Sequence, residues 1–279
     1  MMGTKKMEFN YCDQLIDDFL KSVKTPRVKK NERYVTGVDL GTACVVVCVL
    51  NQLGEPVAGA YRYADVVRDG MLVDYIGAVH IVQEMITDIE KKLKTTLETG
   101  AVAIPPGTEK LDGGAVKNVA ESAGLEVIQM LDEPTAANHV LKIQNGAIVD
   151  IGGGTTGISI LKDGKVVYVN DEATGGTHFS LVVSGAYQLS YEKAELYKRD
   201  GKNHKELMGV LEPVIDKVAS IISKHITGYN VEELILVGGS ACLDGIEDII
   251  EKRTGVPTRK PKNPMFVTPL GIALSCLGE

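Results

Sequence analysis

The pattern of apolar and polar residues predicts two series of strands and helices, which follow the same order along the chain. The first series opens with strand-like runs over residues 34–40, 43–50 and 57–63. Apolar spacing then predicts a helix over 76–98, a strand at 100–104, a helix at 113–123, a strand at 126–131 and a helix opening at Glu133-Pro134. The second series predicts strands at 147–151, 157–161 and 165–170, helices at 177–189, 191–198 and 202–226, a strand at 233–237, and helices at 243–254 and 269–277. Three strands followed by alternating helices and strands, twice over, predict an α/β fold in two halves.

Residues 1–31 stand apart as an N-terminal extension. Their apolar residues recur at intervals of three and four and would form one face of a helix: Cys12, Leu15, Ile16, Phe19, Leu20 and Val23. Such a face has to be covered, either by the rest of this chain or by a partner protein. An anionic membrane surface is disfavoured because the polar face is acidic. Residues 25–32 are expected to form a linker.

Two short segments repeat the same chemistry, one in each half. Val38-Asp39-Leu40-Gly41-Thr42 is echoed 111 residues later by Val149-Asp150-Ile151 and the turn Gly152-Gly153-Gly154-Thr155. An aspartate at a strand end can hold Mg²⁺ directly or through water, and glycines let backbone N–H groups approach phosphate oxygens. An ordinary β-turn remains the alternative for the first segment, because Asp and Gly dominate turns. Three consecutive glycines favour a ligand at the second, and the pair predicts a nucleotide held from both sides.

Composition narrows the classes of protein that remain. With 44% hydrophobic and 24% charged residues, the 279-residue chain is typical of a soluble globular protein of one large or two ordinary domains. The formal charge of −7 argues against nucleic-acid binding. The one basic cluster, Arg259, Lys260 and Lys262, lies among prolines and is expected to be a solvated loop.

The remaining residue counts point to a protein of the cytoplasm with no membrane partner. No apolar stretch approaches the ~20 residues that span a bilayer, and the N-terminus lacks the apolar core of a signal peptide. The five cysteines form no CxxC pair and are expected to be buried free thiols. The five histidines lack metal-ligand spacing, and no catalytic role is assigned to them.

The motifs resemble those of the actin, DnaK chaperone and sugar-kinase superfamily. The segments at Gly37 to Thr42 and Asp150 to Thr156 are similar to its two phosphate motifs, and Val237-Gly238-Gly239-Ser240-Ala241 to its adenosine motif. Asp132 to Ala137 and Pro269 to Ala273 resemble its two connecting helices. This resemblance implies two RNase H-like domains of the actin-like ATPase fold with the nucleotide cleft between them. It divides the chain into the extension 1–31, a first domain of 32–146 plus 268–279, and a second domain of 147–267.

Further matches point to the bacterial branch that includes FtsA, PilM and MreB. Gly175-Gly176-Thr177 resembles the glycine pair beside the phosphates, Ala194 to Lys198 the helix that contacts adenosine, and Arg68-Asp69-Gly70-Met71 a turn of that branch. The length, the N-terminal extension and the Thr-Pro-Leu-Gly-Ile-Ala ending most resemble the EutJ family of ethanolamine utilisation. That resemblance implies a chaperone-like protein linked to a bacterial microcompartment.

The chain also departs from these relatives. There is no room between the third strand and the long helix for the extra subdomain of DnaK or actin, nor for a catalytic lysine from it. No peptide-binding domain is expected after residue 279, so lid closure on an unfolded client is not expected. The missing subdomain also argues against an MreB-like filament. No counterpart of a sugar-kinase aspartate base is found.

The resemblance assigns Mg²⁺–ATP to the cleft. Asp39 and Asp150 would position the metal through its waters, and Glu133 would orient the attacking water beside Thr155. The contacts with the phosphates, the adenine and the ribose would come from Gly41, Thr42, Ala43, Gly152, Gly153, Gly154, Thr155, Gly175, Gly176, Glu195, Lys198, Gly238, Gly239 and Ser240. Two alternatives stay open: Glu133 as a first-turn carboxylate favoured by the helix dipole, and Glu195 with Lys198 as an i,i+3 surface ion pair.

Small residues in the connecting helices predict how the cleft would move. Ala136, Ala137, Gly271 and Ala273 would let the two helices cross closely beneath it as a hinge. The preferred function is therefore a chaperone-like or reactivating factor with weak ATPase activity, whose closure acts on a protein client or a microcompartment-associated enzyme. The alternative is a scaffold or adaptor like PilM or FtsA with slow hydrolysis, and a small-molecule kinase is a third option. The sequence does not predict the oligomeric state.

Overall fold

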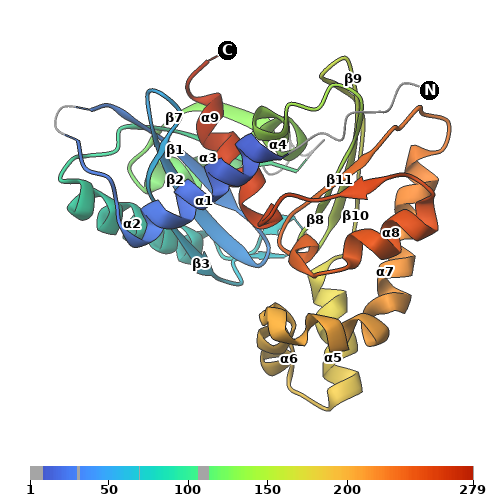
Figure 1. The fold of residues 1–279 in the computed structure, drawn as a ribbon. Helices are drawn as coiled ribbons and strands as arrows, with labels where there is room; N and C mark the ends of the chain where they lie inside the picture. The colour runs from blue at the N-terminus through green and yellow to red at the C-terminus, as the bar shows by residue number, and fades with distance from the viewer. Residues whose placement is uncertain (1–8, 30–31, 69, 106–112, 279) are drawn as a thin grey trace.

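Two five-stranded sheets, each with the same internal plan, form the framework of the molecule (Figure 1). The computed structural model describes residues 9–29, 32–68, 70–105 and 113–278. The first sheet has the order β3-β2-β1-β6-β7 and the second β10-β9-β8-β11-β12. In each sheet the first three strands are antiparallel, and the central strand pairs in parallel with the next strand along the chain, β1 with β6 and β8 with β11. The predicted α/β fold in two halves is confirmed.

The strands lie close to where the apolar runs placed them. Those of the first sheet are β1 (Tyr34–Leu40), β2 (Cys44–Asn51), β3 (Pro56–Tyr63), β6 (Thr99–Ile104) and β7 (Glu126–Asp132). Those of the second are β8 (Gly146–Ile151), β9 (Thr156–Lys162), β10 (Lys165–Glu172), β11 (Leu234–Val237) and β12 (Thr258–Arg259). A small hairpin of β4 (Val67–Arg68) and β5 (Met71–Leu72) was not predicted. It flanks the expected turn at residues 68–71, of which Asp69 lies outside the described residues.

The helices differ from prediction mainly at their ends. They are α1 (Asn10–Lys24), α2 (Tyr75–Leu93), α3 (Gly113–Ser122), α4 (Glu133–Leu141), α5 (Gly176–Tyr187), α6 (Tyr191–Arg199), α7 (His204–Ile226), α8 (Ile246–Thr254) and α9 (Val267–Ser275). Short 3₁₀ turns cover Gly201–Asn203, Ser240–Cys242 and Pro264–Phe266. The expected end of α2 at residue 98 is wrong, because Lys94 adopts a left-handed conformation (φ 56°) that terminates the helix. The helix expected from residue 243 begins at Ile246.

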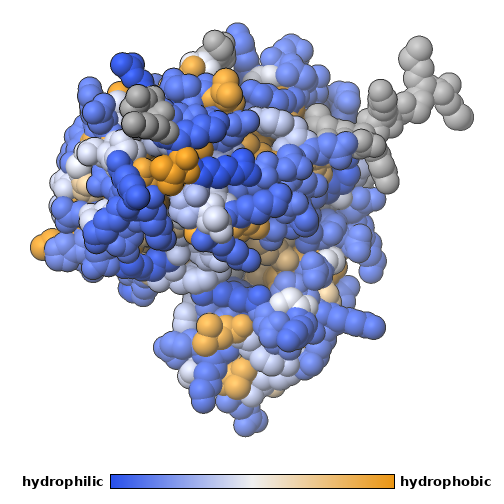
Figure 2. Space-filling view, turned by 60° about the vertical axis from the view of Figure 1, so that its left-hand side comes forward, coloured by the Kyte–Doolittle hydropathy of each residue, from blue (hydrophilic) through white to orange (hydrophobic). Residues whose placement is uncertain are grey.

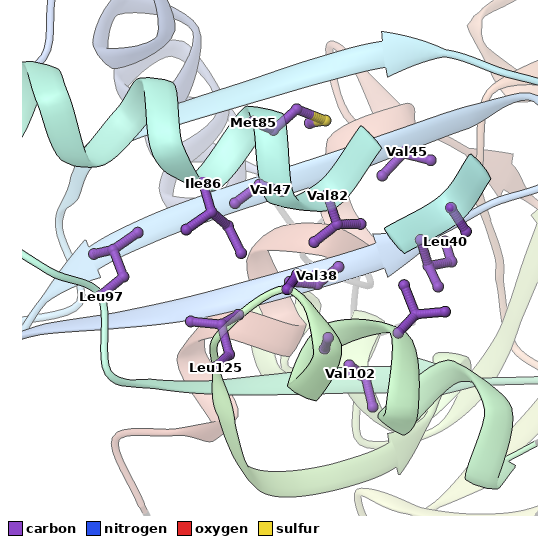
Figure 3. Packing of buried hydrophobic residues seen from close by; sticks show 14 of the residues in the cluster. Val38, Leu40, Val45, Val47, Val82, Met85, Ile86, Leu97, Val102 and Leu125 are labelled. Atoms are coloured by element: carbon purple, nitrogen blue, oxygen red, sulfur yellow. The ribbon is translucent and has the colours of Figure 1, made fainter. Parts of the chain in front are cut away.

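Each sheet is covered on its outer face by helices of its own half. Apolar residues of α2 and α3 pack against β1 and β2, as Val82 and Ile86 over Val38 and Val47 show in Figure 3. Residues of α5, α7 and α8 cover the second sheet in the same way, among them Phe179 and Leu211. These faces read as amphipathic helices in the sequence because burial of one stripe is what stabilises them.

The inner faces of the two sheets share one core that is filled by α1, α4 and α9. The helices α4 and α9 cross so closely that a Cβ on Gly271 would lie 1.7 Å from the carbonyl oxygen of Ala136. A Cβ on Gly37 of β1 would similarly lie 2.5 Å from the backbone nitrogen of Ala273. The predicted close crossing of small residues is therefore confirmed. The division at residues 32–146 plus 268–279 and 147–267 stays a prediction.

The N-terminal helix is covered by its own chain. Cys12, Leu15, Ile16 and Phe19 are buried, and Phe19 packs on Phe266 with 5.3 Å between ring centroids. Its polar side is tied as well, because Asp13 accepts from the backbone nitrogen of Lys262 at 2.8 Å. Of the two alternatives for this helix, the structure shows the one in which it packs on its own protein.

Three smaller expectations concern the basic cluster, the cysteines and the membrane. The prediction of a solvated loop at Arg259 to Lys262 is wrong in part. Arg259 is ion-paired with Glu233 and Lys260 with Glu247, and the side chains of Arg259 and Lys260 are largely buried. All five cysteines are free, with Cys12 and Cys48 buried and the others half-buried. Among the residues described, no helix combines the length and apolarity needed to cross a membrane.

Candidate functional site

The two Asp-containing segments end in the same backbone turn. In the first, Leu40 pairs with Val45 across the hairpin, and the amide of Gly41 donates to the carbonyl of Cys44 at 3.1 Å. In the second, Ile151 pairs with Thr156, and the amide of Gly152 donates to the carbonyl of Thr155 at 2.9 Å. Each loop therefore has the same length and the same closing hydrogen bond, as the sequence repeat indicates.

The two turns meet face to face. A Cβ placed on Gly153 would lie 2.9 Å from the Cβ of Ala43 and 3.3 Å from that of Thr42, both on the opposite turn. Real Cβ atoms do not approach that closely, so the contact between the turns requires glycine at this position. Segments 111 residues apart in the sequence thus form the two sides of one site.

A cleft of about 730 Å³ opens beside this contact. Its volume is within the range of ligand sites in proteins. The lining includes most of the residues that the sequence singled out: Asp39, Gly41, Thr42, Ala43, Glu133, Asp150, Gly152, Gly153, Thr155, Gly176, Glu195, Lys198, Gly238, Gly239 and Ser240. Gly154 and Gly175 are absent from the lining. Gly175 lies behind the glycine turn, where a Cβ would be 2.9 Å from the carbonyl oxygen of Gly152.

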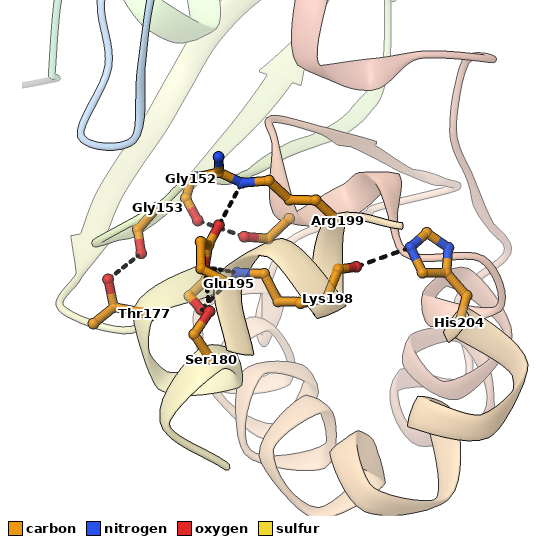
Figure 4. A network of polar contacts seen from close by, with 10 residues as sticks. Gly152, Gly153, Thr177, Ser180, Glu195, Lys198, Arg199 and His204 are labelled. Carbon is orange, nitrogen blue, oxygen red and sulfur yellow. Dashed lines mark hydrogen bonds and ion pairs between the residues drawn. The ribbon is translucent and has the colours of Figure 1, made fainter. Parts of the chain in front are cut away.

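The glycine turn of the second segment is held from behind through its carbonyls. The carbonyl of Gly152 accepts from the amide of Gly176 at 2.9 Å and from the Ser240 hydroxyl at 2.7 Å. The carbonyl of Gly153 accepts from Thr177, at 2.7 Å from its amide and 3.0 Å from its hydroxyl (Figure 4). The Ser240 hydroxyl is therefore already used in a hydrogen bond that holds the turn.

These contacts fix where the amides of the turn point. In a planar trans peptide the N–H of one residue points opposite to the carbonyl of the residue before it. The amides of Gly153 and Gly154 consequently face away from α5. Within the described residues, neither they nor the amides of Thr42 and Ala43 donate to another backbone group. Backbone amides without an internal acceptor are the donors that bind phosphate oxygens.

Three carboxylates line the floor of the cleft and repel one another. Burial, with a contribution from Asp150, raises the pKa of Asp39 to about 7. Burial raises the pKa of Asp150 to about 6, although the Thr268 hydroxyl donates to it at 3.2 Å and opposes the rise. Burial and the charges of Asp150 and Asp39 raise the pKa of Glu133 well above its ordinary value. This arrangement favours a bound cation, which would offset the repulsion.

The site does not supply enough protein side chains to coordinate a metal ion by themselves. No three His, Cys, Asp or Glu side chains within the described residues are grouped closely enough to hold a metal ion. Mg²⁺ usually keeps several waters and takes one or two carboxylates together with substrate phosphates. Asp39 and Asp150 on facing turns fit that kind of site, and the residues present therefore suit Mg²⁺–ATP.

Glu133 lies where the first connecting helix begins. Asp132 caps the helix, accepting from the amide of Thr135 at 2.9 Å and from its hydroxyl at 2.8 Å. Glu133 is thus in the first turn, where the helix dipole favours a carboxylate, and it also lines the cleft. A small cavity beside it is bounded by Asp150 and Ser159, and the buried Ser159 hydroxyl has no hydrogen-bond partner among the described residues.

Glu195 and Lys198 form an ion pair, but not a surface one. Lys198 Nζ lies 2.8 Å from Glu195 and 2.9 Å from the carbonyl of Gly176, and its side chain is only 8% exposed (Figure 4). Burial lowers the pKa of Lys198. Burial by itself raises the pKa of Glu195, but Lys198, Ser180 and Arg199 bring it below its ordinary value. The pair is therefore an internal brace between α5 and α6 that also faces the cleft.

The structure adds residues that sequence reasoning missed. The guanidinium of Arg199 lies 3.6 Å from the ring centroid of Tyr63, which joins α6 of the second half to β3 of the first. Both residues line the cleft. Arg199 directly follows Lys198 in the sequence, but nothing there shows that it reaches Tyr63. Thr268 and Asp171 are the other two, and Asp171 is recognisable only from the pairing of β9 with β10.

The chain is similar in sequence and fold to several known proteins. Residues 116–265 match the family model of Type IV pilus assembly protein PilM. The structure of a PilM-PilN type IV pilus biogenesis complex superposes with a TM-score of 0.72 at 14% identity, covering 90% of this chain and 100% of that chain. MreB5 of Spiroplasma citri bound to ADP does so at 0.68 and 20% identity, covering 86% and 94%. At these identities the likeness shows the fold: a two-domain protein of the actin-like ATPase class.

Nearer relatives specify the family. Ethanolamine utilization protein EutJ of Escherichia coli strain K12 is 43% identical over 253 residues, which cover 90% of this chain and 89% of the relative. The structure of EutJ from Carboxydothermus hydrogenoformans has a TM-score of 0.90 at 42% identity and covers 96% of this chain and 99% of that one. The chain belongs to the EutJ family of ethanolamine utilization proteins.

Proposed function

We propose that this protein binds Mg²⁺–ATP in the cleft and that closure of the two halves on the nucleotide acts on a partner protein of ethanolamine utilisation. The observation that carries the proposal is the meeting of two glycine turns with unused amides beside Asp39 and Asp150. One nucleotide that contacts both halves would favour their closed arrangement by its differential affinity. The hinge would be the crossing of α4 and α9.

Each part of the nucleotide has matching groups in the cleft. The amides of Thr42, Ala43, Gly153 and Gly154 would receive the phosphates, and Asp39 and Asp150 the waters of Mg²⁺. Gly239 leaves room for a flat base, whereas Gly238 lies against Asp150. Lys198, paired with Glu195, and Ser240 both lie beside Gly176. Bound Mg²⁺ would supply charge neutralisation for phosphoryl transfer, which depends mainly on positioning and electrostatics.

Glu133 is the residue that would separate hydrolysis from binding. Its carboxylate is the first group of α4 and lies among Asp39 and Asp150, where it can orient a water. We expect Glu133→Ala to retain ATP affinity within about threefold and to lose turnover by about 10²-fold or more. Isothermal titration with Mg²⁺–ATP and a single-turnover assay measure the two quantities.

A matched carboxylate tests whether this effect is specific. Glu192 is exposed at the rim of the same cleft, and Glu192→Ala should leave both quantities unchanged. If Glu133→Ala hydrolyses ATP at the wild-type rate, Glu133 has no part in the reaction. If the intact wild-type protein gives no heat with ATP and Mg²⁺, the whole proposal fails.

A scaffold or adaptor is the second candidate function. The match to PilM over residues 116–265 favours it, as does the likeness to a PilM-PilN complex, in which this fold assembles with another protein. In such a protein ATP would set a conformation and hydrolysis would be incidental. Tight ATP binding with negligible single-turnover hydrolysis in the wild-type protein would decide for the scaffold over the chaperone-like factor.

The partner would have to use a surface other than the apolar face of α1, which the chain itself covers. We infer a protein client or an enzyme associated with the microcompartment, met in the cytoplasm. The face shown in Figure 2 is mostly hydrophilic with small separate apolar patches, and the lower lobe that carries α5 and α6 is set off from the rest by a constriction. Closure of the cleft would move this lobe relative to the first half.

A further inference from the structure

The two halves can be compared residue by residue behind their turns. In the first half, Asp39 pairs with Val46 across the hairpin, and Val46 pairs in turn with Tyr61 of β3. In the second half, Asp150 pairs with Gly157, and Gly157 pairs with Asp171 of β10. The same backbone positions thus carry an apolar pair in one half and a glycine with a carboxylate in the other.

The apolar pair of the first half is used for packing. Val46 is buried in the core that α1 and α9 share with both sheets. Tyr61 lies against Phe266, with 5.4 Å between ring centroids. The strand positions paired behind Asp39 therefore carry no carboxylate in this half.

Glycine in the second half leaves space that Asp171 enters. A Cβ on Gly157 would lie 3.7 Å from Asp171 Oδ1 and 3.9 Å from the Cβ of Asp150. The carboxylate of Asp171 therefore lies over Gly157, on the same side as Asp150. Burial raises the pKa of Asp171, and a hydrogen bond from the Thr155 hydroxyl opposes that rise. Burial is the main cause that raises the pKa values of Asp150 and Glu133, and the charge of Asp171 raises both further.

Contacts on the neighbouring residue hold this end of β10 in place. Glu172 Oε1 lies 2.9 Å from His225 Nε2 of α7, and His225 Nδ1 lies 2.6 Å from the Tyr168 hydroxyl. The His225 side chain is 9% exposed. Asp171 is thereby kept at its position, and within the described part of the chain it forms no salt bridge with a lysine, arginine or histidine.

The hydrogen bond to Asp171 decides what Thr155 can do in the cleft. A threonine hydroxyl has one donor and two acceptor lone pairs. Once its proton is given to Asp171, only lone pairs remain, and these cannot bind a phosphate oxygen, which is also an acceptor. They can accept from a water molecule.

We propose that Asp171 is a positioning residue that turns the Thr155 hydroxyl into an acceptor for a water of the hydrated divalent cation beside Asp150. This role rests on the proposed binding of Mg²⁺–ATP and deepens it. It differs from the expectation that Thr155 donates to the phosphates. Asp171 also adds a negative charge behind the second turn, at a strand position that carries Tyr61 in the first half.

The test measures how much Mg²⁺ strengthens ATP binding. ATP is titrated calorimetrically into the full-length protein with Mg²⁺ and with excess EDTA, and the ratio of the two Kd values is compared among variants. Asp171→Ala should reduce that ratio by about tenfold while changing the Kd in EDTA by less than about twofold. A merely structural loss would weaken both Kd values alike.

A swapped carboxylate makes the test independent of folding defects. The space at Gly157 accepts a Cβ at ordinary contact distances, so Gly157→Asp added to Asp171→Ala returns a carboxylate to the same place. This double variant should recover most of the ratio, whereas Asp163→Asn at the exposed tip of the same hairpin should never change it.

The outcomes separate the two proposals. A wild-type protein that gives no ATP heat overturns the nucleotide site and with it the role of Asp171. A wild-type protein with a strong Mg²⁺ effect that is unchanged in Asp171→Ala overturns the role of Asp171 alone. Failure of the swap to recover the ratio in a folded double variant also contradicts it.

Discussion

The turn after β1 and the turn after β8 share a backbone but differ in what surrounds them. Both close with the same hydrogen bond, and both present an aspartate to the cleft. Behind the first turn lie Val46 and the helix α1 in the shared core, together with Tyr61, which contacts Phe266. Behind the second lie Gly157, Asp171 and a hydrogen-bonded Thr155. Duplication has thus kept one geometry while one copy took on packing and the other polar chemistry.

The connecting helices show the same asymmetry. Each has a proline in its first turn, Pro134 after Glu133 in α4 and Pro269 after Thr268 in α9, and both Glu133 and Thr268 line the cleft. Glu133 brings a third negative charge, whereas Thr268 donates its hydroxyl to Asp150 and relieves charge. Electrostatic differences between the copies are therefore produced by single side chains on equivalent backbone positions.

The largest expected effect concerns the first half, in which apolar packing lies behind the turn. Phe19 of α1 is fully buried against β3 and Phe266, and a Cβ on Gly59 of β3 would lie 2.3 Å from its Cε2. Phe19→Ala should lower the free energy of unfolding by about 3–5 kcal/mol, because it removes a ring and leaves a cavity. Chemical denaturation followed by circular dichroism measures the change.

The control for this prediction is an exposed apolar residue of the same half. Leu53 is 79% exposed, and Leu53→Ala should change the unfolding free energy by less than about 0.5 kcal/mol. Equal stabilities of Phe19→Ala and wild type would mean that α1 does not stabilise the first half. Packing behind the first turn would then no longer distinguish the two halves.

A second prediction addresses the joint between the copies. A Cβ on Gly271 would meet the carbonyl of Ala136 at 1.7 Å, and backbone cannot move aside as a flexible side chain can. Gly271→Ala should therefore destabilise the protein by about 1–3 kcal/mol or more through overpacking of α4 against α9. The thermal midpoint of unfolding records it.

Gly185 in α5 offers a control of opposite sign. Nothing lies within 4 Å of a Cβ placed there, so Gly185→Ala should stabilise by about 0.5–1 kcal/mol through reduced chain entropy and better helix propensity. Two changes of the same chemistry would then move the midpoint in opposite directions. A shift of the same sign in both would contradict the close crossing of the helices.

The asymmetry between the copies also explains what the sequence could and could not predict. The paired turns and most strands followed from local patterns, because aspartate, glycine and apolar runs are contiguous. Asp171 did not, because its place depends on the register of β10 against β9, which shifts between Val166 and Tyr168. A one-residue slip would turn it to the other face of the sheet.

The end of α2 was mispredicted for a related reason. Apolar spacing continues through Leu97, which is buried, so the pattern extends beyond the helix. The chain nevertheless leaves the helix at Lys94, and Glu90 accepts from the amide of Leu97 at 2.8 Å to hold the loop. A buried loop residue and a helical residue give the same signal in a sequence. The contact of Arg199 with Tyr63 escaped prediction because it joins elements of different halves.

That contact yields the smallest predicted effect. Arg199 lies over the Tyr63 ring at 3.6 Å and is held by Glu195 at 2.7 Å, so it joins the two halves at the cleft that both residues line. Tyr63 is 47% exposed, and a cation–π contact at such a site contributes about 0.5–1 kcal/mol. Tyr63→Leu should therefore speed the release of a bound fluorescent ATP analogue by only about two- to fivefold in stopped-flow measurements.

Tyr63→Phe is the matched variant because it keeps the ring face and removes only the hydroxyl. It should release the analogue at the wild-type rate, while Tyr63→Leu should be faster without a change in the free energy of unfolding beyond about 1 kcal/mol. If leucine and phenylalanine behave alike, the ring does not hold the halves together. The two copies would then be joined by the α4–α9 crossing and the shared core alone, and closure would depend entirely on what the cleft binds.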